Sequence, residues 1–505
     1  DSSEDTPTNN YCTLNSQSHR MLTAPTNGQL DVVIPASTSA HNAVGTFAVD
    51  SGKWYWECNY VADTSDYLYV GVGDAQEWAE LRAVRGNDGE LVPNTGTVAV
   101  SFGDGDVIMV ALDCGENKWW IGKNGSWMLS GDPANGTGYV HNNITSAVPV
   151  SPIFYNATGS GSQSISVNFG ARGFTHTPPA GFKALCTKNL PTPTIKKGTD
   201  YFNTVLYTGN GSDGRAVTGV GFQPNLVWIA NRDRNTYKPL YDSVAGATKM
   251  LRTNTDDAEG TFSTVLQSFD SDGFTVGTDS AHNHNGEDIV SWNWKEGASN
   301  GFDIVSFTPS SGANTYSHSL GVKPDFIIFK SRGSDANWDV YHSALTADYK
   351  LYLNDSGAKI DSGFMNDTEP TSSVFTFDPG SQNGNVHTAL CFSNVSGFLK
   401  AHRYTGNGNA NGPFIYTGFR VAYLLIRNAD RGANWTVYDV KRESQNPIDE
   451  ILEPNITNDE ETGHDFDFLS NGFKVRNSNS FCNHNGEKIV YLAIAERPFK
   501  YANAR

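Results

Sequence analysis

Two copies of the motif NHNGE, at 283–287 and 483–487, carry residue types that could do chemistry. The candidate ligands are His282, His284 and Glu287 around the first copy, and His484 and Glu487 in the second. Imidazole and carboxylate groups bind transition metals, so a metal site is one interpretation. The alternative is a hairpin turn, because Asn-Gly tolerates the positive φ that tight turns require. A third region reads QNGNVH (382–387) instead of the motif. This favours the turn, and we predict no metal site.

The segment Asp270-Ser271-Asp272-Gly273 begins like a calcium-binding loop, with alternating oxygen ligands before a turn glycine. The remaining ligands of such a loop are missing, and a later copy reads Leu469-Ser470-Asn471-Gly472. We therefore predict a plain β-turn here, and no cofactor for the chain.

Catalytic motifs need a particular structural context, such as Gly-x-Ser-x-Gly between a strand and a helix. The segment GSGSQ (159–163) has only the first letters of that motif, with no predicted helix after it. The sequence thus predicts a protein that is not an enzyme. A depolymerase of the host's capsule or lipopolysaccharide is kept as an alternative, because 54 acidic residues always allow some carboxylate pair.

The segment 74–90 reads as a long irregular connection and carries Trp78, Arg82 and Arg85 near its centre. Exposed Trp and Arg are favoured in binding sites because they offer large contact areas and forked hydrogen bonds. We name these three residues as the candidate ligand-binding site. The alternative is that Trp78 caps the fold and the arginines balance nearby acids.

The elements that must position these residues are predicted to be β-strands. The chain has 505 residues with 50 Gly, 27 Phe, 21 Tyr and 11 Trp, and only 18% of its residues are charged. Aromatic residues fill pleated faces and Gly supplies positive φ in turns, so the fold class is all-β, with several domains. The net charge of −18 repels nucleic acid and anionic lipid, and no apolar run is long enough to span a bilayer. We expect no nucleic-acid partner and no membrane insertion.

Residues 1–190 read as one unit, with predicted strands at 52–60, 67–73, 106–113 and 118–127. Asn124-Gly125 predicts a tight hairpin, and Cys58 and Cys114 lie in apolar strands as expected of buried thiols. The ordered motifs GKWYWE, YVGVG, GDVIMVALD and WWIGKNG, closed by SISVNFG (164–170), resemble a SPRY domain. That resemblance implies a bent β-sandwich that recognises proteins and has no catalytic apparatus.

A Pro-rich linker at 191–200 precedes a repetitive region. YTGNG occurs at 207–211 and 404–408, and offsets of 100 and 97 residues relate Tyr241, Tyr341 and Tyr438. The same offsets relate the apolar runs 225–232, 325–332 and 422–429. We therefore predict three homologous β repeats, at 201–297, 298–395 and 396–505. The sequence allows either separate beads or closure around a pseudo-threefold axis.

A SPRY-like unit followed by such repeats and the tail ERPFKYANAR resembles virion proteins of marine tailed bacteriophages. The resemblance implies a fibre, spike or capsid decoration on the virion surface that attaches to the host cell. The implied partners are other virion proteins and a host surface receptor or glycan, engaged through several copies. We also expect a homo-oligomer, with a trimer favoured. A structural cement or collar protein of the particle is a second alternative beside the depolymerase.

Overall fold

The computed structural model describes residues 5–502, except 7, 36–40, 64–66, 75–80, 94–95, 143, 145–148 and 157–160. Regular structure in these residues is almost entirely β-strand, so the chain is an all-β protein as predicted. The α-helices described are the single turns α1 (Ser280–Asn283) and α2 (Ser480–Asn483). The 3-10 turns described are η1 (Met128–Ser130), η2 (Gly198–Asp200), η3 (Ala298–Asn300), η4 (Gly363–Met365), η5 (Gly380–Gln382) and η6 (Phe499–Tyr501). Within the described residues, no helix is long and apolar enough to cross a membrane.

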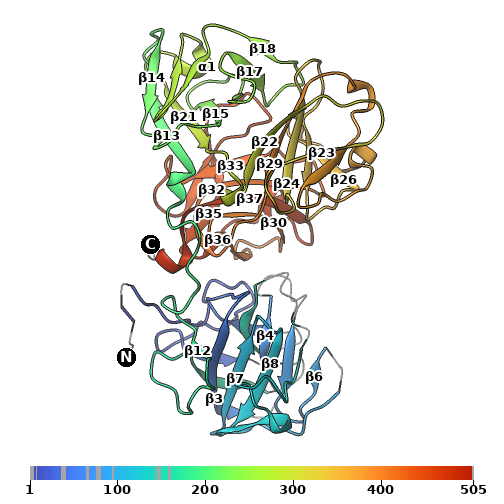
Figure 1. The fold of residues 1–505 in the computed structure, drawn as a ribbon. Helices are drawn as coiled ribbons and strands as arrows, with labels where there is room; N and C mark the ends of the chain where they lie inside the picture. Colours follow the sequence, from blue (N-terminus) through green and yellow to red (C-terminus); the bar gives the residue numbers. More distant parts are fainter. Residues whose placement is uncertain are drawn as a thin grey trace. The chain divides into compact units, whose positions relative to one another are not determined.

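The chain forms two compact units (Figure 1). Unit 1 contains the residues up to Thr192, together with Pro413–Tyr416 and the segment that begins at Phe499. Unit 2 contains Pro193–Gly412 and Thr417–Pro498. Two short segments in the range expected for the third repeat, 396–505, therefore belong to unit 1.

Unit 1 contains two β-sheets that pack face to face. One sheet has the order β1 (Asp31–Ile34), β11 (Gln163–Asn168), β3 (Lys53–Asp63), β7 (Val107–Asp113), β8 (Lys118–Lys123) and β9 (Ser126–Trp127), with β12 (Lys183–Ala184) parallel to β3. The other has the order β2 (His41–Val44), β10 (Ser151–Asn156), β4 (Leu68–Gly73), β5 (Arg82–Arg85) and β6 (Leu91–Val92). The connection between β8 and β9 is the predicted Asn-Gly hairpin, with φ of 48° at Asn124 and 85° at Gly125.

Side chains on alternate positions of β3 show how the sandwich is held together. Trp54, Trp56 and Cys58 face the core between the two sheets, where they pack with residues of β4 and β10. Tyr55 points to the opposite face and packs edge-on against Phe174, with ring centroids 4.8 Å apart. Both faces of β3 are therefore buried, which explains why its sequence is nearly continuously apolar. All six cysteines are buried free thiols, and burial raises the pKa of Cys12 to about 12.

The late segments of the chain complete unit 1. Phe499 belongs to the apolar core of the sandwich and packs edge-on against Phe47, with ring centroids 4.7 Å apart. The Lys500 ammonium donates to the carbonyls of Thr187 and Lys188, at 3.2 and 2.9 Å. The second late segment is β31 (Phe414–Tyr416).

Unit 2 contains three repeats, and their large sheets begin with the same strand order. In repeat 1 the order is β13 (Phe202–Thr208), β21 (Asp288–Trp294), β15 (Leu226–Asn231), β16 (Pro239–Asp242), β17 (Lys249–Arg252) and β18 (Gly260–Thr261). In repeat 2 it is β22 (Phe302–Phe307), β29 (His387–Phe392), β24 (Phe326–Ser331), β25 (Asp339–His342), β26 (Tyr349–Tyr352) and β27 (Ile360–Asp361). In repeat 3 it is β30 (Leu399–Thr405), β37 (Lys488–Pro498), β32 (Phe419–Asn428) and β33 (Thr436–Asp439).

A smaller sheet covers one face of each large sheet. These sheets contain β14 (Arg215–Thr218), β20 (Gly273–Val276) and β19 (Leu266–Asp270) in repeat 1, β23 (Asn314–Ser317) and β28 (Val374–Phe377) in repeat 2, and β36 (Gly472–Val475), β35 (Glu461–Leu469) and β34 (Ile448–Ile451) in repeat 3. The segment that resembled a calcium loop is the predicted β-turn, because Asp270 pairs with Gly273 between β19 and β20.

The tyrosines related by the 100- and 97-residue offsets occupy one register position. Tyr241 pairs with Val227, Tyr341 with Ile327, and Tyr438 with Leu424. The strand that each tyrosine pairs with has both faces buried, because one face meets the small sheet and the other meets the centre of unit 2. In β15, for example, Val227 and Ile229 lie in the core of repeat 1, whereas Leu226 and Trp228 reach the centre.

The three large sheets share this apolar centre, so the repeats are arranged around one axis (Figure 1). Each repeat contributes side chains to it: Trp228 and Trp294 from repeat 1, Phe326 and Phe392 from repeat 2, and Tyr423 and Leu492 from repeat 3. The Trp294 and Tyr423 rings lie edge to face, with centroids 5.7 Å apart. Aromatic pairs of this geometry contribute beyond their buried area.

One backbone contact occurs three times and closes the ring. A loop of each repeat accepts an amide hydrogen bond from the next repeat, at 2.8 Å in every case: Ala336 to Asp256, Ala433 to Ser356, and Thr236 to Thr457. We call these the 1–2, 2–3 and 3–1 junctions. Because repeat 3 returns to repeat 1, the repeats form a closed pseudo-threefold ring, which the sequence had left open.

Candidate binding site

The two sequence motifs shared by repeats 1 and 3 fold together into one local structure. In repeat 1, the Gly209 amide donates to the Glu287 carbonyl at 2.8 Å, and the Gly286 amide donates to the Gly209 carbonyl at 2.9 Å. We call this pair of turns the double turn: residues 207–211 with 283–287 in repeat 1, and 404–408 with 483–487 in repeat 3. The strands before and after NHNGE belong to different sheets, so the predicted hairpin is wrong.

A fully buried asparagine joins the two halves of each double turn. The side-chain oxygen of Asn283, the last residue of α1, accepts from the Asn210 amide at 2.8 Å. In repeat 3, Asn483 accepts from the Asn407 amide at the same distance. Buried side-chain amides that bond to backbone in this way fix a loop conformation, because leaving them unpaired costs free energy.

The first glycine of each YTGNG segment is required by close backbone approach. A Cβ atom on Gly209 would lie 2.0 Å from the His284 carbonyl oxygen, and one on Gly406 would lie 2.2 Å from that of His484. No side chain fits at these distances, so the glycine allows the two turns to touch.

Each double turn carries the same cluster of Arg, His, Glu and Asn side chains. In repeat 1, the Glu287 carboxylate accepts from Arg234 Nε at 2.9 Å and from Asn231 Nδ2 at 2.7 Å, and His284 Nδ1 lies 3.1 Å from it. The hydrogen bond from Arg234 lowers the pKa of Glu287, so the carboxylate is ionised at neutral pH. The side chains of Arg234 and His284 are 39% and 43% exposed and can reach a ligand.

Repeat 3 reproduces this cluster with equivalent residues. Glu487 accepts from Arg431 Nη2 at 2.8 Å and from Asn428 Nδ2 at 2.7 Å, and His484 Nδ1 lies 3.2 Å from it. Arg431 lowers the pKa of Glu487 in the same way. Repeat 2 differs, since it carries Ser334 at the position of the arginine. Two of the three repeats thus present one polar arrangement.

The remaining candidate histidine, which directly precedes the first motif, lies apart from this cluster. His282 is fully buried, and its ring lies 2.6 Å from the Tyr241 hydroxyl and 2.7 Å from the Asp279 carboxylate. It therefore does not join His284 and Glu287. Among the described residues, no group of three or more His, Cys, Asp or Glu side chains is placed to hold a metal ion.

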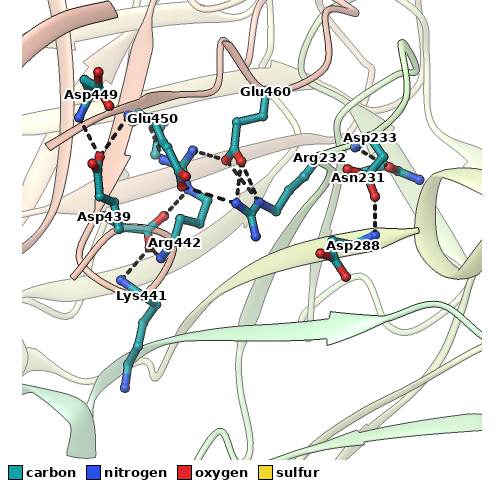
Figure 2. Close-up of polar contacts among 12 residues, drawn as sticks. Asn231, Arg232, Asp233, Asp288, Asp439, Lys441, Arg442, Asp449, Glu450 and Glu460 are labelled. Carbon is teal, nitrogen blue, oxygen red and sulfur yellow. Dashed lines mark hydrogen bonds and ion pairs between the residues drawn. The ribbon is translucent and has the colours of Figure 1, made fainter. Parts of the chain in front are cut away.

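The 3–1 junction carries a buried ion cluster (Figure 2). At the 3–1 junction, Arg232 Nε donates to Glu460 at 2.8 Å, and its Nη2 lies 3.2 Å from Glu450. The fully buried Arg442 donates to Asp439 at 2.6 Å and to Glu460 at 2.7 Å. Sequence reasoning missed this cluster because its members are far apart in the chain. The 100-residue offset between Arg232 and Arg332, which lies at the 1–2 junction, is the signal that could have revealed it.

The structure places two of the three predicted ligand residues on a strand. Arg82 and Arg85 lie on β5, where Val84 pairs with Val70 of β4, so this part of 74–90 is not the irregular connection we expected. Arg82 is largely buried, and Arg85 donates to Tyr69 at 3.0 Å and pairs with Asp88 and Glu90. Trp78 lies outside the described residues.

The SPRY domain of human HERC1 is similar to 32% of this chain and 96% of that chain, at 17% identity and a TM-score of 0.23. Among curated proteins, no match was found. A family model described as "Domain of unknown function (DUF7483)" matches residues 197–498. Because this match spans more than half of the sequence, the chain belongs to the DUF7483 family.

Proposed function

We propose that this chain is a non-enzymatic attachment protein, carried on the surface of a bacteriophage particle beside other virion proteins. It would bind a protein or glycan of the host cell surface through several copies of one site. The observation that supports this proposal is the recurrence of the double turn, with the same exposed arginine and histidine, in repeats 1 and 3 of one ring. The location on a phage particle and the host cell as target are inferred from the sequence resemblance to virion proteins.

The chemistry of the double turn suits a polar surface ligand. Arg234 and Arg431 are each held by a carboxylate yet remain partly exposed, so their outer N–H groups can donate to hydroxyl or carboxylate oxygens of a ligand. Two weak sites on one rigid ring gain avidity, because binding at one raises the effective concentration at the other. Several copies of the chain on one particle would multiply this effect.

The test is glycan-array and host-cell binding by the full chain, compared with Arg234→Ala, Arg431→Ala and the double variant. Each single substitution should weaken binding several-fold, and the double variant should lose most of it, because avidity requires both sites. Arg172→Ala is the matched control, since Arg172 is an equally exposed arginine in an ion pair of unit 1. Wild-type binding by the double variant would contradict the proposal.

Two other outcomes would replace the attachment proposal with one of the alternative functions. Release of reducing sugars from host capsule or lipopolysaccharide would make the chain a depolymerase. Loss of particle integrity without loss of cell binding, on removal of the chain, would make it a cement protein.

A further inference from the structure

The 1–2 junction contains a cavity of about 320 Å³ between repeats 1 and 2. Its polar wall is formed by Asp242 and Glu259 of repeat 1 and by Arg332, Ser306 and Thr388 of repeat 2. Val386 also lines it and is 44% exposed, so the cavity can be reached from solvent. A volume of this size lies at the lower end of small-molecule sites.

The equivalent space at the 3–1 junction is filled by larger side chains. Asp242 and Asp439 end equivalent strands, and three residues later repeat 1 has Ala245 where repeat 3 has the buried Arg442. The strand pair Ser306 and Thr388 of repeat 2 corresponds to Leu206 and Val290 of repeat 1. The 1–2 junction thus combines one truncated side chain with two polar replacements, and together these open a polar cavity.

Charge balance shows which ligand this cavity suits. Arg332 bonds to both Asp242 and Glu259, and Lys249 Nζ lies 3.7 Å from Glu259. Lys249 lies outside the cavity lining, at the position that Glu450 occupies in repeat 3. Both carboxylates of the lining are already bonded to Arg332, so neither offers an unpaired charge to an ion. A neutral ligand that both donates and accepts hydrogen bonds is favoured.

One lining group still lacks a hydrogen-bond partner. Thr388 is 1% exposed, and its hydroxyl oxygen is buried without a partner in the protein. A buried hydroxyl without a partner destabilises the fold unless something bonds to it. The side chains of Ala245 and Val386 add an apolar edge beside the polar wall. We propose that this cavity binds a neutral polyhydroxylated molecule about the size of one sugar ring, through the hydroxyl of Thr388 and the carboxylates of Asp242 and Glu259.

The experiment is saturation-transfer difference NMR on the full chain with D-glucose, D-galactose, D-mannose and N-acetylglucosamine as probes. At least one sugar should show transfer. Thr388→Val keeps the side-chain shape and removes the hydroxyl. It should therefore weaken sugar binding and raise the dissociation constant by about tenfold. Ala245→Leu introduces the residue that repeat 2 has at this position, Leu345, and should abolish transfer by filling the cavity. Val244→Leu changes the exposed neighbour and should bind like the wild type.

Thermal unfolding of each variant separates loss of the site from loss of the fold. The inference is overturned if none of the sugars shows transfer, which would mean that the cavity holds only water. It is also overturned if transfer persists in folded Ala245→Leu that also carries Arg234→Ala and Arg431→Ala, because that variant lacks the arginines of the double turns and their own sugar binding. The cavity lies outside the double turn, so the Arg234→Ala and Arg431→Ala variants should retain sugar transfer. The cavity and the proposed attachment site can therefore fail separately.

Discussion

Three buried cationic side chains at the junctions donate to backbone carbonyls of the neighbouring repeat. Lys330 donates to the Asp256 carbonyl and Lys238 to the Asn458 carbonyl, both at 2.7 Å, and Arg427 donates to the Tyr352 carbonyl at 2.6 Å. Burial lowers the pKa of Lys330 and of Lys238 to about 8, and that of Arg427 to about 10. All three remain largely charged at neutral pH. They order the loops that join one repeat to the next.

His342 gives a prediction for acid stability. Its Nδ1 accepts from the Ala344 amide at 3.1 Å, which fixes a neutral ring, and burial lowers its pKa to about 3. The unfolded chain takes up a proton below about pH 6.5 and the folded chain does not, so stability falls as pH decreases from 6.5 toward 3. The loss by pH ~4.5 should be about 2–3 kcal/mol.

The measurement is the free energy of unfolding in denaturant, followed by spectroscopic signals from unit 2 at several pH values. It is made for the wild type and for His342→Asn. Asparagine keeps an acceptor for the Ala344 amide but does not titrate, so the variant should lose that part of the pH dependence. His141, whose pKa burial lowers to about 4, remains in both proteins and serves as the internal reference. Parallel pH profiles for the two proteins would refute the assignment.

At the scale of elements, the double turn depends on close contact between two turns. Gly209→Ala should destabilise unit 2 by about 2 kcal/mol, because its Cβ must displace the His284 carbonyl. The same shift should move His284 away from Glu287, which amide and imidazole NMR signals would report. Gly363→Ala is the control: it has open space around the added atom and should cost less than about 1 kcal/mol. Equal costs for the two variants would show that backbone approach is unimportant here.

Local pattern predicted the strands better than it predicted their partners. The runs that became β15, β24 and β32 were apolar throughout because both of their faces are buried, and that is visible in sequence. The NHNGE segments looked like hairpins because Asn-Gly is a turn signal, yet the turn connects two sheets. Arg82 and Arg85 looked like loop residues because the pairing of β5 with β4 is not encoded in their own pattern. The cavity at the 1–2 junction depends on the small side chain of Ala245. The sequence could not predict this cavity, because the equivalence of Ala245 and Arg442 becomes clear only when the two repeats are compared in the structure.

At the scale of the whole molecule, the ring is closed by contacts between repeats of one chain. The predicted self-association is a separate matter, because it concerns contacts between different chains. We predict a homotrimer by analogy with phage fibres, since closed assembly adds valency and stability. Multi-angle light scattering of the full chain at micromolar concentration should give three times the monomer mass. A persistent monomer mass would remove the trimer and leave the attachment proposal standing.

Phe499 and Lys500 have a consequence for biosynthesis. The ribosome makes unit 1 almost completely before it begins unit 2, yet the ring of Phe499 lies in the core of the first unit. The core of the sandwich therefore remains incomplete beside Phe47 until Phe499 has emerged from the exit tunnel. Domains generally fold in the order of their synthesis, but this contact joins the first unit to a segment made after the ring. Chains that stop before Phe499 would lack it, so the completed sandwich core requires that the ring has also been synthesised.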